Sequence, residues 1–160
     1  MWILIGFVVV VIGAITLTLS NPLSSRVTES VPVTATPGLN SEIEVGTFAV
    51  TVHSVDESEA SSNGVKTVTL DMSARNDADK AGSFTSDQVK LRDSAGREYE
   101  PKLGGLGNMT INPGITEKGT VSFEVSESAE ITEALIRADM FDMGGADYVR
   151  VDLTKGDPAQ

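Results

Sequence analysis

Apolar residues recur with a period of two over most of the chain, from Glu42 to Leu153. This alternation is typical of a β-strand with one buried face, whereas an amphipathic helix repeats every 3.6 residues. The pattern is clearest at residues 68–74 and recurs at 48–52, 89–91, 121–125, 136–140 and 149–153, with a short partner at 97–100 that turns Tyr99 inward. About seven short antiparallel strands predict an all-β fold, a β-sandwich over residues 42–153.

Turn-forming residues separate these runs. Residues 93–96, Asp-Ser-Ala-Gly, predict a tight turn in which Gly96 is free to adopt a positive φ. Residues 112–114, Asn-Pro-Gly, have Pro and Gly at the second and third positions of a type II turn. Residues 76–79, Asn-Asp-Ala-Asp, are expected to end the long strand that precedes them.

The first nineteen residues form a different kind of segment. Residues 1–19 contain no charge, Pro, Asn or Gln. As a helix they would span about 28 Å, close to the hydrocarbon thickness of a bilayer. A signal peptide would have a basic start, a shorter apolar core and a small-x-small cleavage site, and Thr18-Leu19-Ser20 is a poor one. We therefore expect one N-terminal transmembrane helix that acts as an uncleaved signal anchor, with secretion as the alternative if it is cleaved.

The segments that flank the predicted domain are polar and contain proline. Residues 20–41 are rich in Pro, Ser and Thr and predict an extended linker. Residues 154–160 predict a flexible tail. Arg26 is the only basic residue between the apolar segment and Lys66, so the chain after residue 19 should translocate easily. We expect a single-pass protein of the cell membrane with an extracytoplasmic C-terminal domain.

Composition excludes several classes. The sequence has no cysteine, which rules out disulfides and a lipid anchor on cysteine. The formal net charge is −11, with 23 acidic against 12 basic residues. Nucleic-acid binding requires a basic footprint, so we expect no nucleic-acid partner.

Four motifs taken in order resemble one known family. They are Gly46 with the alternating run after it, the long run ending in Asn76-Asp77, the segment 89–101 (VKLRDSAGREYEP), and Asn112-Pro-Gly followed by 118–125 (KGTVSFEV). Together they resemble the envelope-domain family called domain of unknown function 4352, over about residues 42–153. The resemblance implies an immunoglobulin-like sandwich similar to that of a small secreted mycobacterial antigen, and an envelope location. It implies no activity and no functional residues. Many members are lipoproteins, whereas this chain would use its N-terminal helix.

Loop acids are the candidate metal ligands. Calcium prefers several converging loop oxygens. The candidates are Asp77 and Asp79 after one strand and Asp142 and Asp147 around Gly144-Gly145, with further acids at 56, 57 and 59. Their spacing matches no EF-hand, so solvated loop acids are the simpler interpretation and calcium the possible cofactor. One histidine without cysteine makes a zinc site implausible.

The single histidine, His53, does not predict catalysis. It is out of register with the inward residues 50 and 52, so we expect it to face solvent. A Ser-His-Asp triad would need it buried beside a serine and an acid. We therefore expect no catalytic residues and no enzyme.

The segment between the strands at 97–100 and 121–125 is predicted to be a flexible insertion. Gly104-Gly105-x-Gly107 lacks the Lys-Ser/Thr of a phosphate loop. The apolar residues Leu103, Leu106, Met109 and Ile111 either fold back on the core or form a contact patch. Asn108 begins an Asn-Met-Thr glycosylation sequon.

Three functions remain. The leading hypothesis is a membrane-anchored binding module with no enzymatic activity, whose loops or sheet edge hold an envelope protein, a surface polymer or a ligand. The alternative is a structural or stator-like element that attaches an assembly to the cell wall or surface layer. This is an analogy with archaellum stator-type proteins at the level of architecture only. A hydrolase is the third function, and the lack of a base placed beside a nucleophile counts against it.

Overall fold

The computed structural model describes residues 35–106, 109–138 and 147–156. Over these ranges the chain forms strands and one short 3-10 helix. In chain order they are β1 (Glu42–Val45), β2 (Phe48–Glu57), β3 (Val65–Asn76), β4 (Gly82–Phe84), the 3-10 helix η1 (Ser86–Gln88), β5 (Val89–Asp93), β6 (Glu98–Tyr99), β7 (Pro101–Gly105), β8 (Met109–Ile111), β9 (Thr116–Ser126), β10 (Ile131–Ile136) and β11 (Val149–Asp152).

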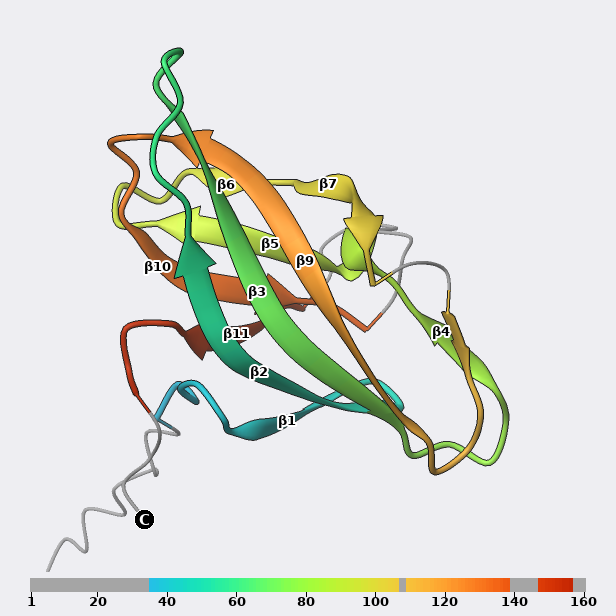
Figure 1. Cartoon of the computed structure of the whole chain (residues 1–160). Helices are drawn as coiled ribbons and strands as arrows, with labels where there is room; N and C mark the ends of the chain where they lie inside the picture. Colours follow the sequence, from blue (N-terminus) through green and yellow to red (C-terminus); the bar gives the residue numbers. More distant parts are fainter. Residues whose placement is uncertain (1–34, 107–108, 139–146, 157–160) are drawn as a thin grey trace, which may run out of the picture. The chain divides into compact units, whose positions relative to one another are not determined.

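The strands form a β-sandwich, which confirms the predicted all-β class (Figure 1). One sheet has the order β1-β2-β3-β9-β7, the facing sheet has the order β11-β10-β5-β6, and β4 pairs with β8. All named strand pairs are antiparallel. The inward residues of both sheets share one core, which includes Val50, Leu70, Met72, Leu91, Phe123, Ala134, Ile136 and Val151.

Period-two alternation located the long strands correctly. β3 lies between β2 and β9, with Leu70 opposite Val55 on one side and Val121 on the other. The predicted turns are also confirmed. Gly96 has a φ of 82° and Gly114 a φ of 72°. The N–H of Ile115 bonds the carbonyl of Asn112 at 3.1 Å, which closes the Asn-Pro-Gly turn.

The strand predicted at residues 136–140 is wrong at residues 137 and 138, and residues 139 and 140 lie outside the described part. β10 begins at Ile131 and ends at Ile136, and Ala138 is exposed. The register shifts between Ile131 and Glu133, and Ala134, Leu135 and Ile136 beyond the shift are buried in succession, so β10 shows no clean alternation. This local irregularity hides the strand from a period-two pattern.

The expected flexible insertion is also wrong, because β7 and β8 lie in it. β7 pairs with β9, and β8 pairs with β4. Leu106 and Ile111 are buried in the core, so these two fold back rather than forming a contact patch. The side chains of Leu103 and Met109 lie outside the described part. These short strands, with β1 and β4, raise the number of strands above the seven expected.

The sandwich extends past both predicted boundaries. The carbonyl of Pro37 accepts a hydrogen bond from the N–H of Asp152 at 2.8 Å, and the N–H of Leu39 bonds the carbonyl of Lys155 at 3.2 Å. Residues 34–160 form one compact unit with its own core. Such a unit is expected to fold without the preceding residues.

The predicted membrane segment, residues 1–19, and most of the predicted linker lie outside the described residues. Over the described ranges, no helix is long and apolar enough to cross a membrane.

Candidate functional site

The predicted calcium ligands do not converge over the ranges that the structure describes. Asp77 and Asp79 are exposed after β3, and Asp147 is exposed before β11. Asp142 lies outside the description. No three His, Cys, Asp or Glu side chains among the described residues are grouped closely enough to hold a metal ion.

Asp77 instead belongs to an ion-pair network with Arg75 and Glu42. The Arg75 Nε lies 2.7 Å from Asp77 Oδ1, and its Nη1 lies 2.9 Å from Glu42 Oε2. The hydrogen bond from Arg75 holds the pKa of Asp77 below its usual value. The pKa of Arg75 is raised, first by Asp77 and then by Glu42. The network thus ties β1 to the end of β3.

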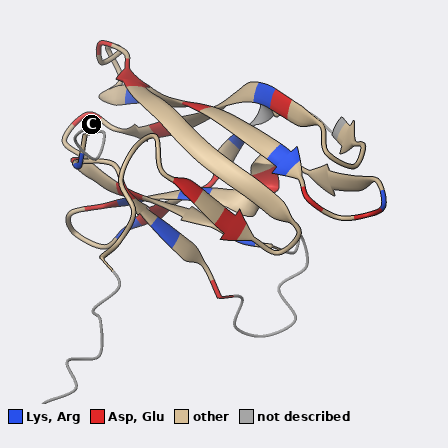
Figure 2. Ribbon diagram, turned by 90° about the horizontal axis from the view of Figure 1, so that it is seen from below, with Lys and Arg blue, Asp and Glu red and all other residues tan. Residues whose placement is uncertain are grey.

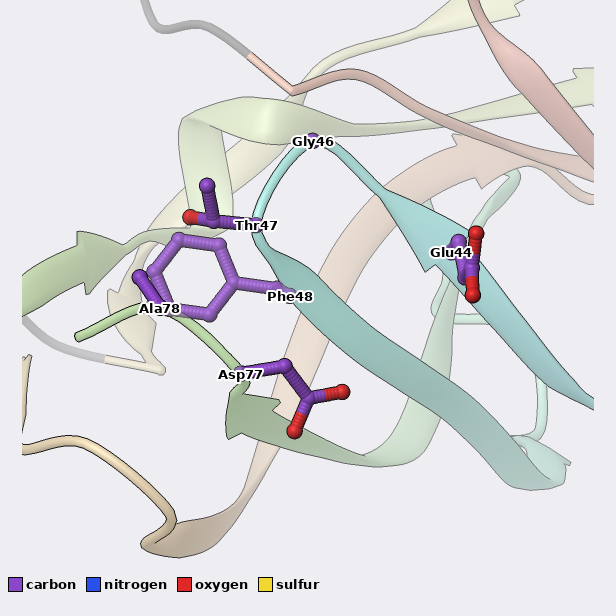
Figure 3. Close-up of a pocket in the computed structure, with 6 residues that line it drawn as sticks. All are labelled: Glu44, Gly46, Thr47, Phe48, Asp77 and Ala78. Carbon is purple, nitrogen blue, oxygen red and sulfur yellow. The ribbon is translucent and has the colours of Figure 1, made fainter.

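A pocket of about 290 Å³ lies beside this network. Its lining comes from β1, the turn after it, the start of β2 and the two residues after β3. Figure 3 shows the Phe48 ring near Thr47 and Ala78. The carboxylates of Glu44 and Asp77 point away from the ring. The six lining residues are Glu44, Gly46, Thr47, Phe48, Asp77 and Ala78. One wall is therefore aromatic and the other acidic.

The turn between β1 and β2 shapes the pocket. Val45 pairs with Phe48, so the turn has two central residues, Gly46 and Thr47. Gly46 has a φ of 62°, as the first central residue of a type II′ hairpin requires. A Cβ at Gly46 would lie 2.8 Å from the Cβ of Ala138, so both conformation and space favour glycine here.

Asn76 holds the other wall in place. Its side chain is fully buried, and its Nδ2 donates to the carbonyls of Lys80 at 2.8 Å and Ile111 at 2.7 Å. Its Oδ1 accepts the N–H of Ala78 at 3.0 Å. The N–H of Asp77 donates to the carbonyl of Thr47 at 2.9 Å. These bonds fix residues 77–80 against the β1–β2 turn.

The Phe48 wall is rigid because the ring is part of the core rim. Phe48 is 6% exposed, and its ring centroid lies 5.6 Å from that of Phe84 in a tilted arrangement. A Cβ added to Gly82 would lie 3.0 Å from the Phe48 ring. The ring therefore has little room to turn away from the pocket.

A second pocket, of about 300 Å³, lies where residues 35–38 meet Lys155 and Gly156. Its lining is mostly backbone and small side chains, with Lys155 as its one ionisable residue. The pocket at Phe48 combines charge with an aromatic wall, so we take it as the candidate site.

His53 was expected to face solvent, and the structure shows it half-buried. The register shifts between Val52 and Ser54, and His53 is half-buried at that bulge. Its Nε2 lies 2.9 Å from the Oγ of Ser73 on β3. The bulge was not detectable from the alternation because an extra residue in one strand has no fixed sequence signal.

A buried carboxylate, Asp93, supports the predicted turn at 93–96. Its Oδ1 accepts the N–H groups of Ala95 and Arg97, and its Oδ2 accepts from Arg97 Nε at 2.6 Å and from the Tyr99 hydroxyl at 3.0 Å. Burial raises the pKa of Asp93, but these bonds outweigh it and leave the pKa below its usual value. Tyr99 thus points inward as predicted.

The other candidates lie at the chain's periphery or outside the description. Asp56 and Glu59 are exposed near the β2–β3 turn, and Glu57 pairs with Lys66 at 2.6 Å. Asn108, the predicted glycosylation residue, lies outside the described residues. Of the pocket residues, only Asp77 was a sequence candidate, because nothing local marks Glu44 or Phe48.

Charges of both signs are spread over the domain. Figure 2 shows Lys and Arg interspersed with Asp and Glu across both sheets. On the four-stranded sheet, Lys90 pairs with Glu100 at 2.6 Å and Arg92 with Glu98 at 2.7 Å. The excess of acids is therefore partly neutralised where the sheet carries basic side chains.

Several solved structures share this fold. The yjhA protein of Bacillus subtilis is 16% identical, with a TM-score of 0.58 over 73% of this chain and 98% of that chain. MPT63, a secreted protein of Mycobacterium tuberculosis, is 17% identical, with a TM-score of 0.56 over 74% of this chain and 98% of that one. A functionally unknown protein of Listeria monocytogenes is 15% identical, with a TM-score of 0.54 over 74% of this chain and 83% of that one.

Sequence comparison gives one further finding. The family model described as "Domain of unknown function (DUF4352)" matches residues 37–146. No curated protein matches the chain. The match includes the whole lining of the pocket at Phe48.

Proposed function

The chain belongs to the DUF4352 family, and on that premise we propose that it is an extracytoplasmic binding module, held at the membrane by residues 1–19 and without enzymatic activity. The apolar N-terminal segment supports the anchor. The fold shared with MPT63, a secreted protein, supports a location outside the cytoplasm and an immunoglobulin-like form of the sandwich. The partner would be an envelope protein or a surface polymer.

The pocket at Phe48 is the observation that carries the binding role. It has a rigid aromatic wall and two carboxylates, and it lies at one end of a sheet edge. Pockets that combine an apolar wall with a few fixed polar groups are the usual form of a binding site. Both walls are held by backbone hydrogen bonds and by Asn76, so the site needs little rearrangement on binding.

The arrangement at His53 supports a non-enzymatic role. Within the described residues, the hydrogen-bond partner of the imidazole is the Ser73 hydroxyl. A serine nucleophile also needs an acid that orients the histidine and donors for the oxyanion. Ser73 is 8% exposed on a continuous strand, which leaves little room for a substrate carbonyl.

Affinity capture tests the proposed function. Residues 35–160 are immobilised, and solubilised envelope from the native cell is passed over them with and without calcium. This bait keeps Pro37 and Leu39, whose backbone atoms bond the C-terminal residues. An unrelated domain of similar net charge is the control for ion exchange. We expect one saturable partner. Absence of any saturable partner in both conditions would refute the binding role.

Membrane anchoring is tested separately on the full chain. We expect it to resist alkaline carbonate extraction and to be digested by protease added to intact cells. Deletion of residues 1–19 should release it. A full chain that carbonate extracts completely, or that external protease cannot reach, would contradict the anchor or its orientation.

A further inference from the structure

Building on the proposed binding function, we propose that β1 and the adjoining pocket bind an extended, basic polypeptide segment. The segment would add to the free edge of β1 as a further strand. Basic side chains at alternate positions would face Glu42 and Glu44. One of them would lie beside Glu44, which also lines the pocket.

Within the described residues, β1 is an edge strand whose backbone groups on one side have no strand partner. Among the described strands it pairs with β2 alone (Figure 1). In a two-residue hairpin the first and last turn residues, here Val45 and Phe48, share a backbone hydrogen bond. Antiparallel pairs then alternate between bonded and non-bonded. The N–H and C=O groups of Glu42 and Glu44 therefore point away from β2, toward the open edge.

The side chains of β1 determine the chemistry of the partner. Ile43 and Val45 are buried, whereas Glu42 and Glu44 are exposed on the outer face. A strand added to this edge would place side chains about 5 Å from theirs on that face. Opposite charges there stabilise the pair and like charges oppose it. Lys or Arg at every second position is the complementary pattern.

The local charge balance supports a cationic partner. Glu42, Glu44 and Asp77 supply three carboxylates against the one guanidinium of Arg75, which bonds Glu42 and Asp77. These four groups carry a net charge of −2. A second copy of this chain would place its own Glu42 and Glu44 at the same edge, so repulsion disfavours pairing of β1 with itself. The occupant is therefore a different, basic strand.

The pocket continues from the end of β1. Glu44 belongs both to the edge and to the lining, and the Phe48 ring forms the opposite wall. A lysine or arginine side chain has an apolar stem and a charged end. Its charged end would lie near Glu44 and Asp77 on the outer face, whereas the Phe48 ring, opposite Val45, lies on the buried face. Backbone pairing would supply affinity, and the pocket would select the basic side chain.

A labelled peptide titrated into the full chain tests this proposal. The chain is held in zwitterionic detergent micelles, and binding is followed by fluorescence anisotropy, with empty micelles as the blank. The probe is a short peptide of Lys alternating with Thr and Val. One control peptide has Glu in place of Lys, and another has Pro at two central positions. We expect saturable binding of the Lys peptide only.

Variants at Glu44 separate charge from backbone pairing. Glu44→Gln removes the charge and should weaken binding by about three- to fivefold, as for an exposed ion pair. Glu44→Pro also removes the outward N–H and should weaken it by about tenfold or more. The matched control Glu59→Gln, at an exposed acid of the β2–β3 turn, should stay within about twofold. Melting temperatures of all variants are compared with the wild type.

Defined results overturn the proposal. These are no binding of the Lys peptide to the wild type, equal binding of the proline peptide, or unchanged binding to Glu44→Gln. If Glu44→Pro does not fold, Glu44→Gln and the proline peptide still decide. Capture of an envelope partner that is unaffected by the Glu44 variants would leave the binding function standing and refute the β1 site. Peptide binding without any envelope partner would support the edge and refute the wider function.

Discussion

Replacing Asn76 by alanine should destabilise the sandwich strongly. The side chain is fully buried and makes three hydrogen bonds, two from Nδ2 and one to Oδ1. Each such bond contributes about 1 kcal/mol net, and a buried group left without a partner costs about 1–3 kcal/mol. The carbonyl of Ile111, a residue 1% exposed, would lose this donor. We expect a loss of about 3–4 kcal/mol in the free energy of unfolding.

Urea unfolding of residues 34–160, followed by far-ultraviolet circular dichroism, measures this loss. With a slope of about 1–3 kcal/mol per molar urea, the midpoint should fall by about 1–4 M. The control is Asn63→Ala, an exposed asparagine in the β2–β3 turn, which should change stability by less than about 0.5 kcal/mol.

A second variant, Asn76→Asp, separates the donors from the acceptor. It keeps an oxygen for the N–H of Ala78 but places a buried carboxylate against the carbonyls of Lys80 and Ile111. At neutral pH it should be at least as destabilising as alanine, and acidification should restore part of the loss because protonation removes the charge. If Asn76→Ala unfolds within about 1 kcal/mol of the wild type, Asn76 does not hold the pocket wall as argued.

Three further predictions concern the turn, pH and His53. Gly46→Ala should lower the free energy of unfolding by about 2–3 kcal/mol, because it combines a positive φ with a contact to Ala138; Gly96→Ala, with positive φ but open space around it, should cost less, and equal urea midpoints for the two would contradict the contact. The Asp152 carboxylate is bonded by the Thr154 hydroxyl and Lys155, which lower its pKa from 3.8 to about 2, so its stabilisation is complete above about pH 4 and is lost as the pH falls through 2. Asp152→Asn should therefore lose less stability than the wild type between these pH values, and parallel urea midpoints would refute this. His53→Ala should leave hydrolysis of an ester and peptide panel at the background rate of the buffer, and wild-type turnover abolished by this variant would establish a hydrolase instead.

Long strands and tight turns were predictable from the sequence because both depend on local patterns. An alternating run such as 68–74 has only one conformation that buries every apolar side chain on one face. The turns at Gly96 and Gly114 need residues that tolerate a positive φ, and the sequence shows them directly. The family resemblance rested on the same strands and turns, and the DUF4352 match confirms it.

The short strands were not predictable because their stability comes from their neighbours. β4 and β8 have three residues each and, among the described strands, pair with one another. Their buried residues, Phe84 and Ile111, join the common core. A three-residue segment carries too little periodicity to be recognised by itself.

The candidate site depends even more on tertiary structure. Glu44 and Phe48 come from one hairpin, whereas Asp77 and Ala78 follow β3, and only the pairing of β2 with β3 brings them together. The sequence by itself determined which residues face the core, where the chain turns and that residues 1–19 are apolar, since these follow from side-chain chemistry and local backbone preference. Only the tertiary structure decided that β1 is an acidic edge strand among the described strands, that Asn76 is buried and that Phe48, Glu44 and Asp77 line one pocket, because strand order and register depend on packing between distant segments.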